Sequence, residues 1–168
     1  PTAPQFGGGV GPLLFADWIR AVPAGSEISL YLHVPFCRRL CWFCACHTKQ
    51  TLRYEPVEAY LKGLHAEIAA IGGRVSREVP VTALHFGGGS PTMVRPDDLI
   101  DLMAALRSAF RFADDVEISV EMDPNDLDEP RYDALAAIGM TRASLGVQDF
   151  HPEVQKAINR IQTFEQTK

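Results

Sequence analysis

Apolar and polar residues alternate along this chain with two different periods, and each period predicts one type of secondary structure. From residue 28 onward, short segments with a period of two are separated by longer segments whose apolar residues recur every three or four positions. The first kind predicts strands at 28–34, 81–86, 116–121 and 141–147, and the second predicts helices at 56–71, 96–110, 129–138 and 152–161. This strand–helix alternation, repeated four times, predicts an α/β fold with a parallel sheet.

The two faces of the predicted strands differ in polarity. One face carries the apolar side chains that helices cover in a parallel sheet, and in the last strand these are Ala143, Leu145 and Val147. The other face is polar, and in a closed barrel it would point into the interior. A polar interior is costly unless water or a ligand fills it. A doubly wound sheet with one solvated edge is one interpretation, but the pattern favours a barrel whose interior holds a ligand. The polar residues of the inward face are Ser29, Tyr31 and His33, then Glu117, Ser119 and Glu121, then Arg142, Ser144 and Gln148.

The beginning of the chain and its overall composition narrow the classes of protein. Residues 1–26 are rich in Gly and Pro and predict an irregular lead-in, with a short helix near 13–21. The chain has 168 residues, of which 46% are hydrophobic, and this suits one soluble globular domain. It has no run of about 18 apolar residues that could span a membrane. Its net charge of -5, without a basic block, does not suggest nucleic acid as a partner. No signal-peptide pattern is visible, so we expect a cytoplasmic protein.

All four cysteines lie in one short segment directly after the first predicted strand, at Cys37, Cys41, Cys44 and Cys46. A disulfide framework would spread its bridges across the fold, so this loop indicates a metal or cluster site in a reducing compartment. The spacing C-x-x-x-C-x-x-C places three thiolates around one centre. Three ligands would leave one iron of a four-iron cluster free to bind a substrate or cofactor. Structural zinc, completed locally by Cys46 and His47, is the alternative.

Two further features are expected at the same edge of the sheet, because the carboxyl ends of parallel strands meet there. The glycines at 87–89 follow the second predicted strand. A turn without side chains lets the backbone approach a ligand, although three glycines also form ordinary tight turns. Glu121 ends the third strand on the inward face, where its carboxylate either accepts hydrogen bonds from a ligand or is solvated.

The residues around the first cysteines carry a specific resemblance. The segment from Tyr31 to Cys37, YLHVPFC, followed by the spacing C-x-x-x-C-x-x-C, resembles the radical S-adenosylmethionine (SAM) superfamily. Cys46, two residues after Cys44, is similar to the pattern of the oxygen-independent coproporphyrinogen III oxidases. The similarity continues at 87–92 (GGGSPT), 118–121 (ISVE), 144–150 (SLGVQDF) and 159–160 (NR). Ser90 stands where Thr is usual in the family, and it keeps the hydroxyl group.

The resemblance implies the fold and the reaction. It implies the first four βα units of a partial (βα)6 radical SAM barrel over residues 27–168, truncated before the barrel and a C-terminal domain are complete. The implied cofactors are a [4Fe-4S] cluster and two molecules of SAM. The implied enzyme is an oxidoreductase that decarboxylates two propionate side chains of coproporphyrinogen III to vinyl groups, giving protoporphyrinogen IX in haem biosynthesis. Its electron donor would be a flavodoxin or ferredoxin, the full-length enzyme would be a monomer, and these 168 residues alone would be inactive.

Two other functions stay open at this point. One is a haem chaperone-like member of the same branch. Such proteins typically have an acidic residue directly after the third cysteine, whereas this chain has Ala45 followed by Cys46, which argues against this function. The other is a zinc or iron–sulfur module that does not cleave SAM.

The resemblance also implies roles for individual residues. Cys37, Cys41 and Cys44 would bind the cluster, and Cys46 would be a nearby thiol that is not a ligand. From the residues alone, Tyr31 is a core aromatic, Phe43 shields the cysteines and Arg160 lies on a helix surface. In the family's pattern these positions contact SAM, and the full set is Tyr31, Phe43, Gly88, Gly89, Ser90 and Glu121, with Gln148 and Arg160 binding the carboxylate of a second SAM.

Overall fold

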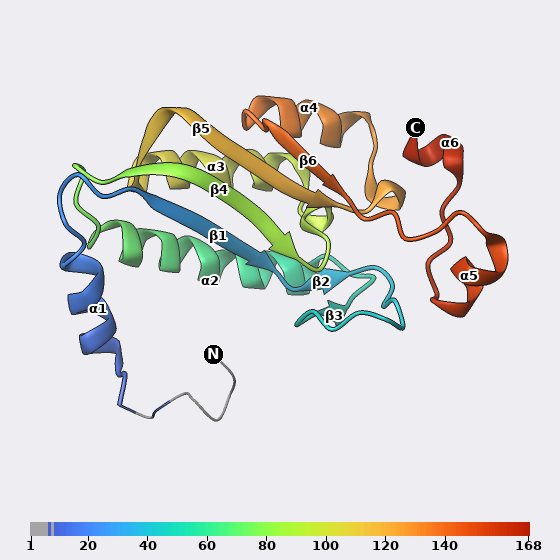
Figure 1. Cartoon of the computed structure of the whole chain (residues 1–168), viewed down its shortest axis with the longest axis horizontal. Coiled ribbons are helices and arrows are strands. Elements are labelled where there is room, and N and C mark those ends of the chain that lie inside the picture. Colours follow the sequence, from blue (N-terminus) through green and yellow to red (C-terminus); the bar gives the residue numbers. More distant parts are fainter. Residues whose placement is uncertain (1–6, 8) are drawn as a thin grey trace.

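The structure, a computed structural model, describes residue 7 and residues 9–168 (Figure 1). It confirms the predicted parallel sheet and the alternation of strands with helices. The strands are β1 (Ile28–Val34), β4 (Pro80–Gly88), β5 (Arg111–Met122) and β6 (Arg142–Leu145), with a separate short pair, β2 (Phe36–Cys37) and β3 (Lys49–Gln50). The helices are α1 (Pro12–Arg20), α2 (Glu55–Gly72), α3 (Pro96–Ala109), α4 (Glu129–Ala137), α5 (Pro152–Ala157) and α6 (Phe164–Thr167), with single 3-10 turns η2 (Pro91–Met93) and η3 (Pro124–Asp126).

The four long strands lie in the order β1-β4-β5-β6, which is also their order along the chain. All neighbouring strands are parallel, and a helix connects each strand to the next. The register pairs Tyr31 with His85, His85 with Ser119, and Ser119 with Arg142. Tyr31, Ser119 and Arg142, which the alternation assigned to the inward face, therefore form a row with His85 across the whole sheet.

Helices α2, α3 and α4 pack against the apolar face of the sheet and enclose the core (Figure 1). The stripe of α2, from Val57 through Leu61 and Leu64 to Ile68, is buried as its spacing of three to four residues predicts. Leu84 and Phe86 of β4 are fully buried in the same core. Central strand β4 is thus held by packing on one face and by hydrogen bonds to a neighbouring strand on each side.

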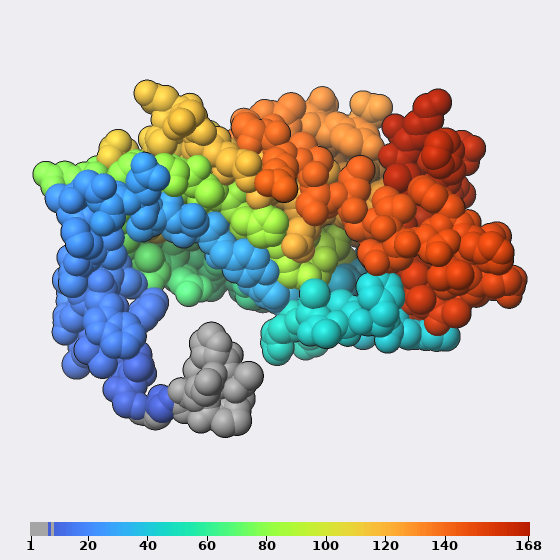
Figure 2. Space-filling view, viewed as in Figure 1, coloured from blue at the N-terminus to red at the C-terminus, as the bar shows by residue number. Residues whose placement is uncertain are grey.

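The opposite, inward face of the sheet is open. Figure 2 looks onto this face, where the strands β1, β4, β5 and β6 are seen side by side. Tyr31 in the middle of β1 is 58% exposed, and Ser29, Glu117 and Ser144 are exposed as well. The polarity predicted for this face is confirmed. Its side chains are accessible to water or to a ligand.

The prediction for the last strand and the helix after it is wrong in two respects. All of β6 is exposed, including Ala143 and Leu145, which were expected to pack against a helix. The next helix, α5, has six residues and lies with α6 beyond the carboxyl ends of the strands, so in the described residues no helix covers this part of β6 (Figure 1). The helix predicted to reach residue 161 ends at Ala157, because Asn159 has a φ of 56°, a left-handed conformation that terminates helices.

The predicted lead-in is described only in part. Residues 1–6 and 8 lie outside the described residues, and α1 forms where the short helix near 13–21 was predicted. Among the helices that the structure describes, none has the length and hydrophobicity needed to cross a membrane.

Candidate cofactor site at the carboxyl edge of the sheet

A cavity of about 570 Å³ opens at the carboxyl edge of the sheet, between the cysteine loop, the ends of β4 and β5, and the segment after β6. Because these elements come from four different parts of the chain, the sheet topology is what brings them together. Ten of the eleven predicted site residues line this cavity: Cys37, Cys41, Phe43, Cys44, Gly88, Gly89, Ser90, Glu121, Gln148 and Arg160. The eleventh, Tyr31, does not.

The cysteine loop is closed at its base by the short strand pair β2 and β3. The backbone N–H of Lys49 donates to the carbonyl of Pro35 at 2.7 Å, and that of Thr51 donates to the carbonyl of Cys37 at 3.0 Å. His33 adds a side-chain contact, because its Nε2 lies 2.9 Å from the carbonyl oxygen of His47. A carbonyl only accepts, so this ring nitrogen carries a proton. The loop that carries the thiols is therefore fixed at both of its ends to β1 and its extension.

The four thiols are free and share one wall of the cavity. Burial raises the pKa of Cys37 to about 11, with further contributions from Cys44, Cys41, Asp126 and Asp123. A thiol in this position becomes a thiolate when a bound metal supplies the compensating positive charge. In the described part of the chain, no three His, Cys, Asp or Glu side chains converge closely enough to hold a single metal ion. The donor chemistry, with four free thiols on one wall, fits an iron–sulfur cluster.

The glycines at the carboxyl end of β4 are required by the close approach of the cysteine loop. Gly88 has a φ of 112°, which residues with a side chain rarely adopt. A Cβ at Gly89 would lie 2.5 Å from the carbonyl oxygen of Phe36 and 2.8 Å from Cys37 Sγ. The N–H of Gly89 also donates to the carbonyl of Val34 at 2.8 Å. These glycines let the turn pack directly against the chain that leads into the first cysteine.

Replacement of Gly89 by alanine should lower the free energy of unfolding by about 1–3 kcal/mol, because its Cβ would press on backbone and a cysteine sulfur. The matched control is Gly63→Ala in α2, where an added Cβ meets nothing within 4 Å. In a helix interior that change should raise stability by about 0.5–1 kcal/mol. Urea unfolding followed by circular dichroism measures both. Equal shifts of the same sign would show that the turn tolerates a side chain.

Glu121 is the carboxylate of the cavity. Its Oε2 accepts a hydrogen bond from the N–H of Gly88 at 3.1 Å, and its Oε1 lies 3.2 Å from His85 Nε2. The other ring nitrogen of His85 lies 2.6 Å from the hydroxyl of Ser119. The carboxylate is held by two neighbours but is 43% exposed, so a ligand in the cavity can reach it.

Tyr31 lies beside the cavity rather than on its wall. Its ring stacks on that of His85, with centroids 5.6 Å apart, and its hydroxyl lies 2.9 Å from His33 Nδ1. Burial, with smaller contributions from Glu121 and Cys46, raises the pKa of Tyr31. The hydroxyl therefore keeps its proton and acts as a donor. A direct contact of Tyr31 with SAM stays a prediction, and the structure adds its contact with the histidine that holds Glu121.

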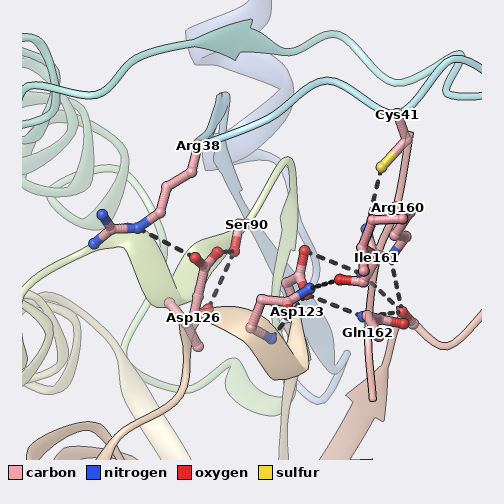
Figure 3. A network of polar contacts seen from close by, with 11 residues as sticks. Arg38, Cys41, Ser90, Asp123, Asp126, Arg160, Ile161 and Gln162 are labelled. Carbon is pink, nitrogen blue, oxygen red and sulfur yellow. Dashed lines mark hydrogen bonds and ion pairs between the residues drawn. The ribbon is translucent and has the colours of Figure 1, made fainter. Parts of the chain in front are cut away.

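Ser90 is buried, and its hydroxyl is already engaged within the protein. It donates to Asp126 Oδ2 at 2.7 Å, and Asp126 Oδ1 in turn lies 3.2 Å from Nε of Arg38 (Figure 3). The side chain of Asp126 is 6% exposed. Arg38 directly follows Cys37, so this chain of contacts ties the cysteine loop to the turn after β5.

Arg160 is close to the second cysteine. Its Nη1 lies 3.4 Å from Cys41 Sγ, its Nη2 donates to the carbonyl of Gly146 at 2.7 Å, and the same Nη2 lies 3.3 Å from Asp123 Oδ2 (Figure 3). Asp123 also accepts from the buried Gln162 at 3.1 Å. The surface role that position alone assigns to Arg160 is therefore wrong, because the side chain is only 13% exposed.

The decisive comparison is with protein families. The sequence model of the radical SAM superfamily matches residues 31–168, which is most of the chain. This chain belongs to the radical SAM superfamily. The match begins at Tyr31 and includes the cysteine loop, the glycine turn, Glu121 and Arg160. Membership of this superfamily implies a [4Fe-4S] cluster and SAM as its cofactors.

Several relatives of this radical SAM chain are named coproporphyrinogen III oxidases. It is 55% identical to the oxygen-independent coproporphyrinogen III oxidase of Paracoccus denitrificans (strain Pd 1222) and 44% identical to that of Pseudomonas aeruginosa (strain PAO1). Both alignments cover 100% of this chain and 37% of the relative. The solved coproporphyrinogen III oxidase (HemN) from Escherichia coli, titled a radical SAM enzyme, matches with a TM-score of 0.92 at 38% identity, over 99% of this chain and 38% of that one. This chain thus spans less than two fifths of the length of these relatives.

Three charged residues that line the cavity were not predicted from the sequence: Arg38, Asp123 and Asp126. Both aspartates lie within four residues of the carboxyl end of β5, the edge where parallel sheets place functional residues, and this position could have singled them out. Arg38 gave no comparable signal, because its partner is distant in sequence.

Proposed function

We propose that this chain supplies the cluster- and SAM-binding part of an oxygen-independent coproporphyrinogen III oxidase, which converts coproporphyrinogen III to protoporphyrinogen IX. The observation that carries the proposal is the cavity, on whose walls the cysteine loop, the glycine turn, Glu121, Gln148 and Arg160 meet. The names of the relatives supply the substrate.

The residues of the cavity have complementary tasks in this proposal. Cys37, Cys41 and Cys44 hold the cluster and leave one iron without a protein ligand. When bound, the cluster and SAM would supply the electron transfer and the hydrogen-atom abstraction. Each propionate would then lose carbon dioxide, pass one electron to a one-electron acceptor and become a vinyl group. Glu121 binds SAM through its partly exposed carboxylate. Phe43 excludes water beside the cysteines, since its ring lines the cavity and is half exposed.

The glycine turn and the segment after β6 complete the SAM contacts. Gly88, Gly89 and Ser90 line the cavity, and the two glycines bring no side chain into it. Gln148 is exposed and lines the same cavity, so its amide is free to bind a carboxylate. With Arg160 it is the proposed site of a second SAM. Tyr31 helps to position Glu121 through His85, in addition to any direct contact of Tyr31 with SAM.

The partners and the compartment follow from the chemistry. Each cleavage of SAM requires one-electron reduction of the cluster, so the proposed donor is a flavodoxin or ferredoxin. Four free thiols suit the reducing cytoplasm. The proposed full-length enzyme is a monomer whose remaining length completes the barrel over the open polar face of the sheet.

A chimaera tests the proposed function. Residues 1–168 of this chain would replace the corresponding 38% of the Escherichia coli enzyme. Under anaerobic conditions with SAM, a reductant and coproporphyrinogen III, the chimaera should form protoporphyrinogen IX, whereas the 168-residue chain alone should not.

The matched control is the same chimaera with Cys41→Ser, which should form no product. A chimaera that takes up the cluster and cleaves SAM but leaves coproporphyrinogen III unchanged would contradict the proposed substrate. Transfer of bound haem without decarboxylation would instead assign the chain to the haem chaperone-like proteins.

A further inference from the structure

The segment after α5 contacts three consecutive residues of the cysteine loop. The N–H of Trp42 donates to the carbonyl of Ile158 at 3.0 Å, and the amide of Asn159 donates to the carbonyl of Leu40 at 2.8 Å. Between them, Arg160 Nη1 lies 3.4 Å from Cys41 Sγ. Figure 2 shows the cyan cysteine loop against the orange-red end of the chain. Cys41 is therefore fixed from both sides at the place where its sulfur meets the guanidinium.

The guanidinium itself has little freedom to move. Its Nε and Nη2 both donate to the carbonyl of Gly146, at 3.1 and 2.7 Å, and Nη2 also faces Asp123 (Figure 3). Asp123 is held in turn by the backbone N–H of Asn125 at 3.0 Å and by Gln162 at 3.1 Å. A planar donor group with three fixed contacts presents its remaining nitrogen in a constant direction. That direction is towards Cys41 Sγ.

We propose that Arg160 donates a hydrogen bond to the cluster thiolate of Cys41 and thereby raises the reduction potential of the cluster. One-electron reduction adds one negative charge to the cluster, and part of this charge lies on the cysteine sulfurs. A charge-assisted hydrogen bond stabilises the reduced form more than the oxidised form, and hydrogen bonds to the sulfurs are among the factors that set cluster potentials. The inference rests on the proposed cluster at Cys37, Cys41 and Cys44, and it gives Arg160 a task that is separate from SAM binding.

Two variants test the proposal in the reconstituted chain without SAM. Arg160→Gln removes the charge and most of the donors, so its cluster should be reduced only at a more negative potential. Gly146→Ala changes no charge, but its Cβ would lie 2.7 Å from Arg160 Nη2 and would displace the guanidinium. Its potential should shift in the same direction by a smaller amount. An anaerobic reductive titration followed by electron paramagnetic resonance measures both potentials.

The matched control is Arg131→Gln. Arg131 is buried to a similar degree, 15% exposed, and it contacts Asp128 and the carbonyl of Thr92 instead of the cysteine loop. Its loss should leave the potential unchanged even where it lowers stability. A shift in the reduction potential that arose only from weaker folding would appear in Arg131→Gln as well.

The outcomes separate this inference from the proposed function. Potentials of Arg160→Gln and Gly146→Ala equal to that of the unchanged chain, at full cluster content, would overturn the inference and leave the proposed function intact. If Arg160→Gln takes up no cluster, Gly146→Ala decides, because its backbone conformation accepts alanine and its Cβ would press on the Arg160 side chain rather than on backbone. An unchanged chain that takes up no cluster would overturn both proposals.

Discussion

Replacement of Cys37, Cys41 or Cys44 by serine should abolish the four-iron cluster. These three cysteines line one wall of the cavity, and a hydroxyl group neither ionises at neutral pH nor matches the affinity of a thiolate for iron. With two cysteines left, the cluster would have two irons without a protein ligand. Iron and sulfide content per chain after anaerobic reconstitution, together with the visible absorption of the cluster, measures the loss.

Cys46→Ser is the matched control, and it should keep the full cluster. Cys46 is exposed on the same loop, and a hydrogen bond with Cys44 is the largest of the causes that raise its pKa. If Cys46→Ser loses the cluster as completely as the other three variants, the three-ligand assignment is wrong.

Glu121→Gln should weaken SAM binding about ten- to a hundredfold. The change keeps the size of the side chain and removes its charge, and a hydrogen bond to a charged group contributes about 1.5–3 kcal/mol. The contact with the N–H of Gly88 is available to a glutamine oxygen as well, so folding should be little affected. Anaerobic equilibrium dialysis of the reconstituted chain with labelled SAM measures the affinity.

Glu117→Gln is the matched control for charge on the same strand face. Glu117 lies four residues before Glu121 in β5, is exposed, and pairs with Arg142 at 3.4 Å. Its loss should leave SAM affinity unchanged. Equal affinities of the Glu121 variant and the unchanged chain would mean that this carboxylate is a solvated strand end.

The elements that the sequence predicts well are those with a strong local pattern. The bounds of β1 agree at both ends, because uninterrupted alternation from Ile28 to Val34 leaves no other interpretation. In contrast, β5 begins five residues before its predicted start, where Asp114 and Asp115 interrupt the alternation. The pair β2–β3 escaped prediction because two-residue strands have no period. Their pairing depends on how the cysteine loop closes.

The site was predictable where a residue type is unusual at its position. Four clustered cysteines, three consecutive glycines and a carboxylate at an inward strand end are visible in the sequence, and the sheet brings the cysteines, Gly88, Gly89 and the carboxylate to one cavity. The contacts that hold these residues were not predictable. Arg38 and Asp126 are far apart in the chain, as are Cys41 and Arg160, and such pairs leave no local signal. Tyr31 was placed on the correct face, but it lies in the middle of β1 and therefore off the wall of a cavity at the carboxyl edge.

The electron paramagnetic resonance spectrum of the reduced, reconstituted chain, recorded before and after addition of SAM, shows most directly whether the cysteine loop holds a cluster with one iron open to SAM. We expect the signal of a reduced [4Fe-4S] cluster that changes shape with SAM, because the amino and carboxylate groups of SAM would bind the iron that Cys37, Cys41 and Cys44 leave without a ligand. A cluster signal that SAM does not alter, or a chain that takes up zinc and no iron, would contradict this expectation.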